Sequence, residues 1–156
     1  DFEKTLRTNL TGAFMIARQM DRDIVGKYPA TLINVASMYA LNGAHHRIYD
    51  GMPFKNFSAY GMTKAGIHGL TVWLAGYWAN RQATVNTIAP GLIDTPIYGE
   101  GEASEAFKAS LGKSVLFPHR LGTSEEFASL AVELVCNSYM NGETIRIDGG
   151  IRMPPK

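Results

Sequence analysis

The sequence predicts an α/β fold in which a doubly wound parallel sheet is covered by helices on both faces. Two observations lead to this prediction. Short apolar segments rich in β-branched residues alternate along the chain with long helical patterns, which is typical of parallel strands joined by helices. Those apolar segments show little polar alternation, as strands do when both of their faces are buried. The expected order is α-β-α-β-α-α-β, in one domain that spans residues 1–156.

The first elements are a helix, a strand and a long loop. Apolar residues recur at helical spacing over residues 2–26: Leu6, Leu10, Phe14 and Ala17. Residues 31–37 are apolar and β-branched, and predict a buried strand. Residues 38–56 contain Asn-Gly and Asp-Gly pairs and a proline, and predict a loop.

The remaining elements continue the alternation. They are a helix over 58–80, a strand over 84–89, a short helix over 102–111, a helix that ends near Val135 and a strand over 145–148. Thr123 and Glu126 have the spacing of a capping box, which predicts where the last helix begins. Pro90-Gly91 ends the predicted strand over 84–89.

Composition excludes several classes of protein. The 156 residues hold 15 Lys and Arg against 14 Asp and Glu, and the net charge of +1 predicts no nucleic-acid surface. No apolar run approaches the roughly 20 residues of a membrane span, and the first residues do not resemble a signal peptide. Cys136, the one cysteine, allows no internal disulfide and favours the cytoplasm. His45 and His46 have no further ligands at metal-binding spacing, so no metal is expected.

Tyr60 and Lys64 form the most informative pair. Their i, i+4 spacing near the start of a predicted helix places both side chains on one face, one turn apart. A phenol is a poor acid–base group at neutral pH, but a neighbouring ammonium favours the phenolate. Such a pair can exchange a proton with a substrate hydroxyl or carbonyl. An ordinary surface Tyr and Lys would show the same spacing.

Other polar residues stand at the predicted ends of strands or inside the first helix. Ser37 ends the strand 31–37, where ligands of parallel sheets bind, although a serine there also caps its own loop. Asn9 and Gly12 are unfavourable inside a helix and suggest a local kink or a bound water. The turn that begins at Pro90 offers backbone groups and the Thr95 hydroxyl to a planar amide.

Together these residues resemble the short-chain dehydrogenase/reductase family over nearly the whole chain. The matching segments, in the family's order, are Thr8–Gly12, Ile33–Ser37, Tyr60-x-x-x-Lys64, Val85–Gly91 and Ile147–Gly150. The resemblance implies a Rossmann-like sheet. It also implies reversible oxidation of an alcohol to a carbonyl with NAD or NADP.

The resemblance implies a role for each site residue. Tyr60 is expected to be the general acid–base, with Lys64 assisting its ionisation and contacting the nicotinamide ribose. Ser37 is expected to orient the substrate oxygen, and Asn9 to hold a water that links Lys64 to solvent. The expected cofactor contacts are Tyr60, Lys64, Pro90, Gly91, Ile93 and Thr95, with Thr95 at the nicotinamide carboxamide.

The chain departs from the family in two places. Ser37 and Tyr60 are 23 residues apart, about ten more than is usual in the family. The extra segment, residues 45–57, is expected to border the site; it either shapes substrate choice or a subunit contact, or is a plain surface excursion. The family's Gly-rich turn and Asn-Ala-Gly segment do not precede Asn9. The chain therefore resembles the C-terminal catalytic part of the fold, apparently lacking its N-terminal dinucleotide-binding half.

Substrate and activity stay open at this point. Residues 60–69 resemble bacterial members linked to sugar or cell-surface metabolism, whereas residues 117–122 and 141–149 resemble the 3-hydroxyacyl-CoA dehydrogenase type 2 branch. The substrate is thus expected only to be a small alcohol or carbonyl compound. A nucleotide-sugar epimerase or dehydratase, and a non-catalytic fragment with an assembly role, are the alternatives.

A homo-oligomer, either a dimer or a tetramer, is expected. The predicted helices 2–26 and 58–80 carry apolar residues on more than one face. The family packs these helices between subunits. Neither nucleic acid nor a membrane is expected as a partner.

Overall fold

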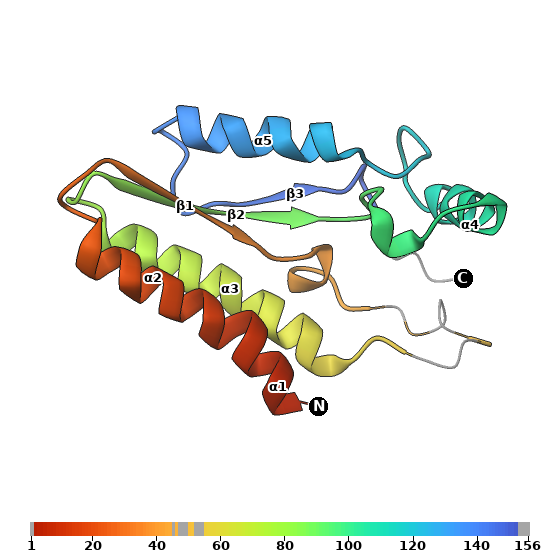
Figure 1. Ribbon diagram of the computed structural model, residues 1–156, viewed down its shortest axis with the longest axis horizontal. Coiled ribbons are helices and arrows are strands. Elements are labelled where there is room, and N and C mark those ends of the chain that lie inside the picture. Colours follow the sequence, from red (N-terminus) through yellow and green to blue (C-terminus); the bar gives the residue numbers. More distant parts are fainter. Residues whose placement is uncertain (1, 45, 47–49, 52–54, 153–156) are drawn as a thin grey trace.

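Three parallel strands form one sheet, which is the frame of the molecule. The computed structural model describes residues 2–44, 46, 50–51 and 55–152. The strands are β1 (Ala30–Val35), β2 (Ala83–Pro90) and β3 (Thr144–Ile147), in that spatial order (Figure 1). β2 pairs with all of β1 on one side and with β3 on the other. The predicted parallel sheet is therefore confirmed.

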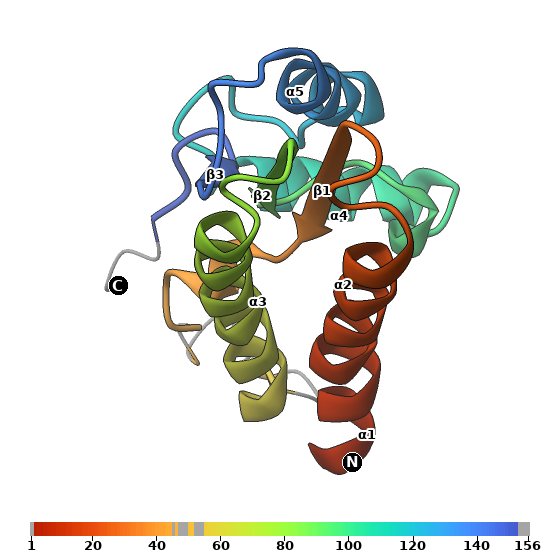
Figure 2. The same ribbon diagram turned by 90° about the vertical axis from the view of Figure 1, so that its left-hand side faces the viewer.

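Helices cover both faces of this sheet. On one face, a long helical segment made of α1 (Phe2–Leu6), η1 (Arg7–Thr11) and α2 (Gly12–Asp23) lies beside α3 (Ser58–Tyr77) (Figures 1 and 2). α5 (Ser124–Cys136) lies on the other face, and α4 (Glu102–Gly112) lies toward the carboxyl ends of the strands. The doubly wound order α-β-α-β-α-α-β is confirmed. Among the described helices, none has the length and apolar character that crossing a membrane requires.

The first strand ends earlier than the sequence predicts. β1 ends at Val35, whereas the prediction extended it to Ser37. The Ala36 amide still bonds to the Ile88 carbonyl of β2 at 2.8 Å, but beyond it the chain turns away from the sheet. Ser37 then becomes the N-cap of η2 (Met38–Ala40), a short 3-10 helix inside the predicted loop. A polar residue that can cap a turn thus sits immediately after the last sheet hydrogen bond.

The first helix is not uniformly α-helical. Arg7–Thr11 form a π-helical turn, η1, between α1 and α2. This turn contains Asn9 and is followed by Gly12, so the predicted local irregularity is confirmed as a widened turn of helix. Such turns are rare and are often found at functional sites. The segment also ends at Asp23 and not at residue 26.

The core lies between the sheet and the α2–α3 face. The largest cluster of buried apolar side chains joins α2, α3 and the strands: Ala17, Val25, Leu74, Trp78, Ala83 and Val85. Trp78 is fully buried, and its indole nitrogen donates to Asp21 Oδ1 at 2.8 Å. Arg81 pairs with the same carboxylate. This end of the core lies at the amino ends of the strands, away from the residues predicted to do chemistry.

A row of buried polar side chains lies between this cluster and the carboxyl ends of the strands. Asn34 of β1 donates to Thr71 Oγ1 of α3 at 2.9 Å, and that hydroxyl lies 2.6 Å from Thr87 Oγ1 of β2. Buried polar groups are costly unless they are paired. The row therefore fixes β1, α3 and β2 relative to one another, directly beneath the carboxyl ends of the strands.

Candidate functional site

The predicted site residues come together because parallel strands end on the same side of a sheet. β1 runs into Ser37, β2 runs into Gly91, and the first turns of α3 carry Tyr60 to the same region (Figure 1). α3 and η2 pack directly against each other. This edge is where ligands bind in open parallel sheets.

Lys64 connects Tyr60 to the end of β1. Its ammonium donates to the Val35 carbonyl at 2.9 Å and lies 5.8 Å from the centroid of the Tyr60 ring. Lys64 is half-buried, and this desolvation lowers its pKa below the usual 10.5. A partly dehydrated cation interacts more strongly with a neighbouring phenolate than a fully hydrated one. The arrangement fits the proton exchange that the i, i+4 spacing predicts.

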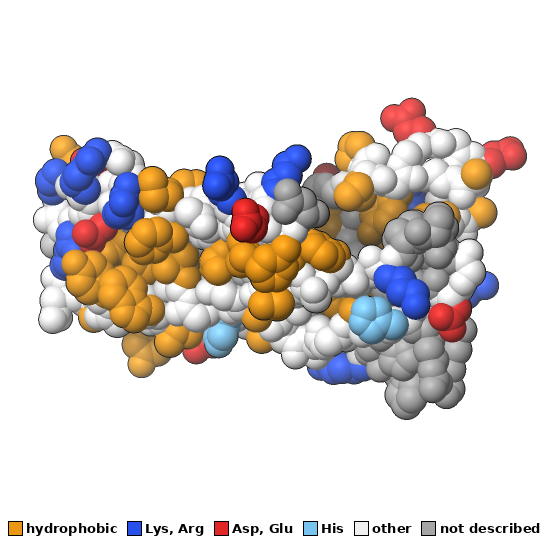
Figure 3. Space-filling model, turned by 90° about the horizontal axis from the view of Figure 1, so that it is seen from below, with side chains coloured by type: hydrophobic (Ala, Val, Ile, Leu, Met, Phe, Trp, Pro, Cys, Tyr) orange, Lys and Arg blue, Asp and Glu red, His pale blue; other side chains and the backbone are white. Residues whose placement is uncertain are grey.

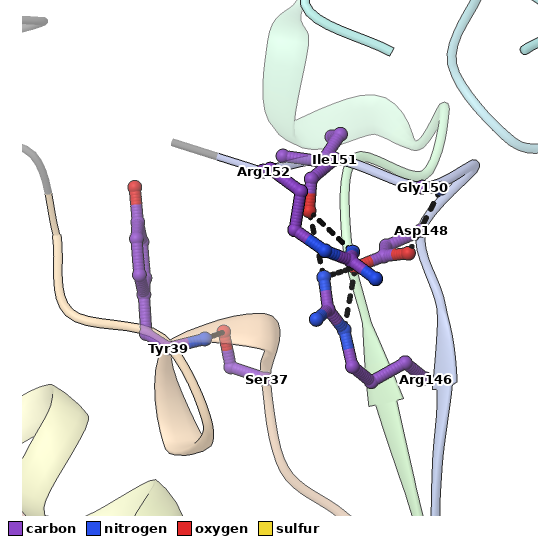
Figure 4. Close-up of polar contacts among 7 residues, drawn as sticks. All are labelled: Ser37, Tyr39, Arg146, Asp148, Gly150, Ile151 and Arg152. Carbon is purple, nitrogen blue, oxygen red and sulfur yellow. Dashed lines mark hydrogen bonds and ion pairs between the residues drawn. The ribbon is translucent and has the colours of Figure 1, made fainter. Parts of the chain in front are cut away.

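Ser37 caps the short helix η2, which contains Tyr39 and packs against α3. Ser37 is buried, and its hydroxyl oxygen accepts a hydrogen bond from the Tyr39 amide at 3.2 Å (Figure 4). The ring of Tyr39 meets that of Tyr60 edge-on, with 6.5 Å between centroids. Ser37 therefore does cap its own turn, as one interpretation of the sequence held. Because the hydroxyl acts there as an acceptor, its own proton can still be donated to a substrate oxygen.

Asn9 reaches the site through a residue that the sequence analysis missed. Its amide donates to Thr63 Oγ1 at 3.2 Å, and the Thr63 hydroxyl donates to the Tyr60 carbonyl at 2.9 Å. Thr63 is fully buried. The widened turn η1 is thereby tied to the first turns of α3. A threonine that bonds back to the carbonyl three residues earlier is a recognised pattern inside helices, but its link to Asn9 depends on packing across 54 residues.

The turn after β2 has little free space around its backbone. Gly91 donates its amide to the Ile147 carbonyl at 3.0 Å, and a Cβ added at Gly91 would lie 2.5 Å from Asp148 Cβ. Beyond it, Pro90, Ile93 and Thr95 line a hollow of about 280 Å³ together with Ser124 and Phe127 of α5. Three predicted cofactor residues therefore share one hollow. Ser124 and Phe127 were not predicted, because only the fold brings α5 beside this turn.

A buried ion pair between Arg146 and Asp148 lies next to Gly91, at the exit of β3. The Asp148 carboxylate is almost fully buried and pairs with Arg146, whose Nε donates to it at 2.8 Å (Figure 4). Arg146 also donates to the Ile151 carbonyl at 2.7 Å, and the Gly150 amide donates to Asp148 at 3.1 Å. Because the two charges pair with each other, neither is left buried without a partner, and the β2 turn packs closely against this exit of β3.

Arg120 and Glu126 form a second ion pair, at the start of α5. Arg120 Nη1 and Nη2 donate to Glu126 Oε2 and Oε1 at 2.9 and 2.8 Å. The Thr123 amide also donates to Glu126, and the Thr123 hydroxyl accepts from the Glu126 amide. The predicted capping box is therefore confirmed. The hydrogen bonds from Arg120 lower the pKa of Glu126 most, and the hydrogen bond from the Thr123 amide lowers it further, from 4.5 to about 2 in all.

Acid is expected to remove the stability that Glu126 contributes. Its folded-state pKa of about 2 lies below the ordinary 4.5, so the unfolded chain takes up this proton first as the pH falls. The contribution is fully present above 4.5 and is lost on approaching 2. The difference in free energy of unfolding between the wild type and Glu126→Gln, measured with urea, should therefore shrink over that interval. Glu125→Gln, in the same helical turn but outside the capping box, is the control. A difference that does not change with pH would contradict the prediction.

Two other expectations concern metals and the segment 45–57. Among the residues that the structure describes, no group of three or more His, Cys, Asp or Glu side chains could hold a metal ion. His45 and much of the segment 45–57 lie outside the described residues, so the role of that segment stays a prediction.

Comparison with known proteins identifies relatives along the whole chain. Residues 1–152 match a family model described as enoyl-(acyl carrier protein) reductase. The 3-hydroxyacyl-CoA dehydrogenase type-2 of Bos taurus is 34% identical over 161 residues, which cover 99% of this chain and 57% of the bovine protein. The chain thus spans little more than half the length of the curated relatives it matches.

Solved structures show the same relationship. A 3-hydroxyacyl-CoA dehydrogenase type-2 from Mycobacterium avium superposes with a TM-score of 0.79 at 33% identity, over 99% of this chain and 58% of that one. A proposed 2-deoxy-d-gluconate 3-dehydrogenase from Agrobacterium tumefaciens, with bound NADP, gives a TM-score of 0.80 at 27% identity, over 96% and 58%. One of these relatives is thus named for a 3-hydroxyacyl-CoA and another for a sugar acid.

Proposed function

Because the chain belongs to the short-chain dehydrogenase/reductase family, we propose that the protein interconverts a secondary alcohol and a carbonyl compound with NAD or NADP. One observation carries the proposal. The Lys64 ammonium lies beside the Tyr60 ring and donates to the carbonyl of Val35, the last residue of β1. Val35 is two residues before Ser37, at the sheet edge where ligands bind. The names of the relatives support it, and one of them holds NADP.

The proposed mechanism assigns each polar residue one task. Tyr60 exchanges a proton with the substrate oxygen, and Lys64 stabilises the phenolate that results. Ser37 donates its hydroxyl proton to the same oxygen and orients it. Asn9 and Thr63 hold the backbone of α3 at Tyr60. The family resemblance also implies that Asn9 holds a water linking Lys64 to solvent, and this role stays a prediction.

The hollow beside β2 fits the flat end of a nicotinamide cofactor. Its walls are largely apolar, and Thr95 and Ser124 bring hydroxyl groups to it. Pro90, Gly91, Ile93 and Thr95 would hold the ring and its amide, and Lys64 and Tyr60 the adjoining ribose. When bound, the cofactor supplies or accepts the hydride, while these residues supply position and electrostatics.

Cofactor binding tests the proposal directly. Titration of the intact protein with NADH and NADPH, followed by the fluorescence of the reduced nicotinamide, should give saturable binding of at least one of them. Reduction of a ketone should then consume that cofactor. An intact protein that binds neither would leave the assembly role as the better explanation. The same titration on residues 1–156 alone shows how much of the cofactor site this chain supplies.

The substrate class can be narrowed. The bovine and mycobacterial relatives are named for 3-hydroxyacyl-CoA, and the segments around α4 carry exposed apolar side chains: Ile97, Phe107, Leu116 and Phe117. Exposed apolar clusters often mark ligand-binding surfaces. Both observations favour a substrate whose alcohol lies beside an acyl chain. Comparing kcat/KM for 3-hydroxyacyl thioesters of increasing length with that for sugar acids distinguishes the two branches.

A homo-oligomer is proposed to form through the outer face of α2 and α3. Figure 3 shows apolar side chains gathered in a band over this side of the molecule. The two helices carry these exposed large apolar residues: Phe14, Met15, Ile16, Val72, Trp73 and Tyr77. The rings of Trp73 and Tyr77 stack with 4.8 Å between centroids. A band of this kind is larger than single scattered apolar residues, and a second copy of the same face would cover it.

Charge placed in this band is expected to separate the subunits. Trp73→Glu should reduce the mass of the intact protein, measured by light scattering at micromolar concentration, to that of a smaller species. Trp73→Phe keeps an apolar ring and should leave the mass unchanged. A wild-type protein that is already monomeric under these conditions would contradict the prediction.

A further inference from the structure

A short link joins the turn after β2 to the segment that precedes α5. The Gly122 amide donates to the Leu92 carbonyl at 2.9 Å, and the Asp94 amide donates to the Gly122 carbonyl at 2.8 Å. Ile93 and Gly122 thereby form an isolated parallel bridge. A Cβ added at Gly122 would lie 2.8 Å from Ile93 Cδ1, so the Ile93 side chain packs directly against the backbone of residue 122 and would have to shift to admit a larger residue.

Arg120 and Glu126 hold residue 122 in place from both sides. The bidentate pair brings residues 120 and 126 together around the turn that contains Gly122. Arg120 Nη1 also donates to the Leu121 carbonyl at 2.9 Å, and Glu126 accepts the Thr123 amide at 2.8 Å. The carbonyl before Gly122 and the amide after it are therefore both bound to the ion pair. The side chain of Leu121 is buried.

The link lies beside the hollow that the cofactor is proposed to use. Ile93, from the turn after β2, and Ser124 and Phe127, from α5, all line this hollow. The Ile93–Gly122 bridge joins the segment that carries Ile93 to the segment that leads into Ser124. Arg120 and Glu126 are themselves not among the residues that line the hollow.

We propose that Arg120 and Glu126 are positioning residues for the cofactor, acting through Gly122 on the turn that carries Ile93 and Thr95. This inference rests on the proposed function, because it assumes that the turn contacts the nicotinamide. Loss of the ion pair frees residue 122, and the turn then holds the nicotinamide less firmly at the hydride-transfer position. Small displacements of reacting groups cost large factors in rate.

Steady-state kinetics of the intact enzyme distinguish positioning from simple loss of folded protein. A smaller folded fraction lowers the apparent kcat but leaves KM unchanged. Glu126→Gln is expected to raise the KM for the cofactor roughly ten-fold, with little change in the KM for the alcohol. Arg120→Met should do the same, and Arg120→Lys, which keeps the charge, should restore part of the loss. Asp21→Asn is the control, because it removes a comparable pair with Arg81 at the opposite end of the strands.

A second measurement does not depend on activity. Amide hydrogen exchange at Asp94 and Gly122 should become faster in Glu126→Gln and stay unchanged in Asp21→Asn. An unchanged cofactor KM in both Glu126→Gln and Arg120→Met, in an enzyme whose wild type is active, overturns the positioning role. Unchanged exchange at both amides in Glu126→Gln refutes the claim that the ion pair stabilises the link. A wild type without oxidoreductase activity refutes the proposed function instead, and the exchange data still decide whether the ion pair holds the turn.

Discussion

Replacing Tyr60 by Phe is expected to lower kcat by about 10²- to 10⁴-fold, the usual contribution of a general acid–base. The substitution removes only the phenolic hydroxyl and keeps the ring that packs edge-on against Tyr39 and lies beside Lys64. Cofactor affinity should be nearly unchanged, because Lys64 and the residues proposed to hold the nicotinamide stay in place. The measurement is the kcat of ketone reduction together with the dissociation constant for the reduced cofactor.

Tyr139→Phe is the matched control for this experiment. It removes the same hydroxyl from a side chain that is 98% exposed and lies in the turn between α5 and β3. This variant should keep the wild-type kcat. Retention of the wild-type kcat in Tyr60→Phe would exclude Tyr60 as the general acid–base, whatever the cofactor affinity proves to be.

Replacing Gly91 by Ala is expected to lower the free energy of unfolding by about 3 kcal/mol, at the upper end of the usual cost of overpacking. The new methyl group would lie 2.5 Å from Asp148 Cβ and 2.9 Å from Asp148 Cα, so the backbone of one segment must move. Asp148 cannot yield easily, since its carboxylate is buried and paired with Arg146. For a domain of this size the melting temperature should fall by roughly 10 °C.

Gly43→Ala provides the comparison, because an added Cβ there has no atom within 4 Å. Its melting temperature should stay close to that of the wild type. If Gly91→Ala melts at the same temperature as Gly43→Ala, the contact between the β2 turn and the exit of β3 does not restrict residue 91. Activity measured on the same samples shows whether the shifted turn also weakens cofactor binding.

The fold could be predicted from sequence because its signals are local. Apolar β-branched segments, the alternation with helices and the capping box at Thr123 all depend on residues close together in the chain. The end of β1 could not be placed as well. It depends on the last hydrogen bond to β2, which the Ala36 amide donates. The accepting carbonyl, that of Ile88, lies 52 residues further along the chain.

The candidate site divides in the same way. Tyr60 and Lys64 lie one turn apart on one helix, so their spacing was readable without the fold. The contacts that place them are not local: Lys64 reaches Val35 across 29 residues and Asn9 reaches Thr63 across 54. Likewise, the capping box at Glu126 was predicted, but its connection to Ile93 required the tertiary structure. The roles of these residues stay predictions until the substitutions above are measured.

The widened turn η1 has a consequence for how this chain aligns with its relatives. A π-helical turn equals an α-helical turn with one residue inserted, and each residue of an α-helix advances the direction of the side chain by about 100°. Deleting one residue from Arg7–Thr11 is therefore expected to rotate Asn9 off the side that faces Thr63. A one-residue gap at this turn in an alignment would mark a homologue that had lost or not yet acquired the Asn9 contact.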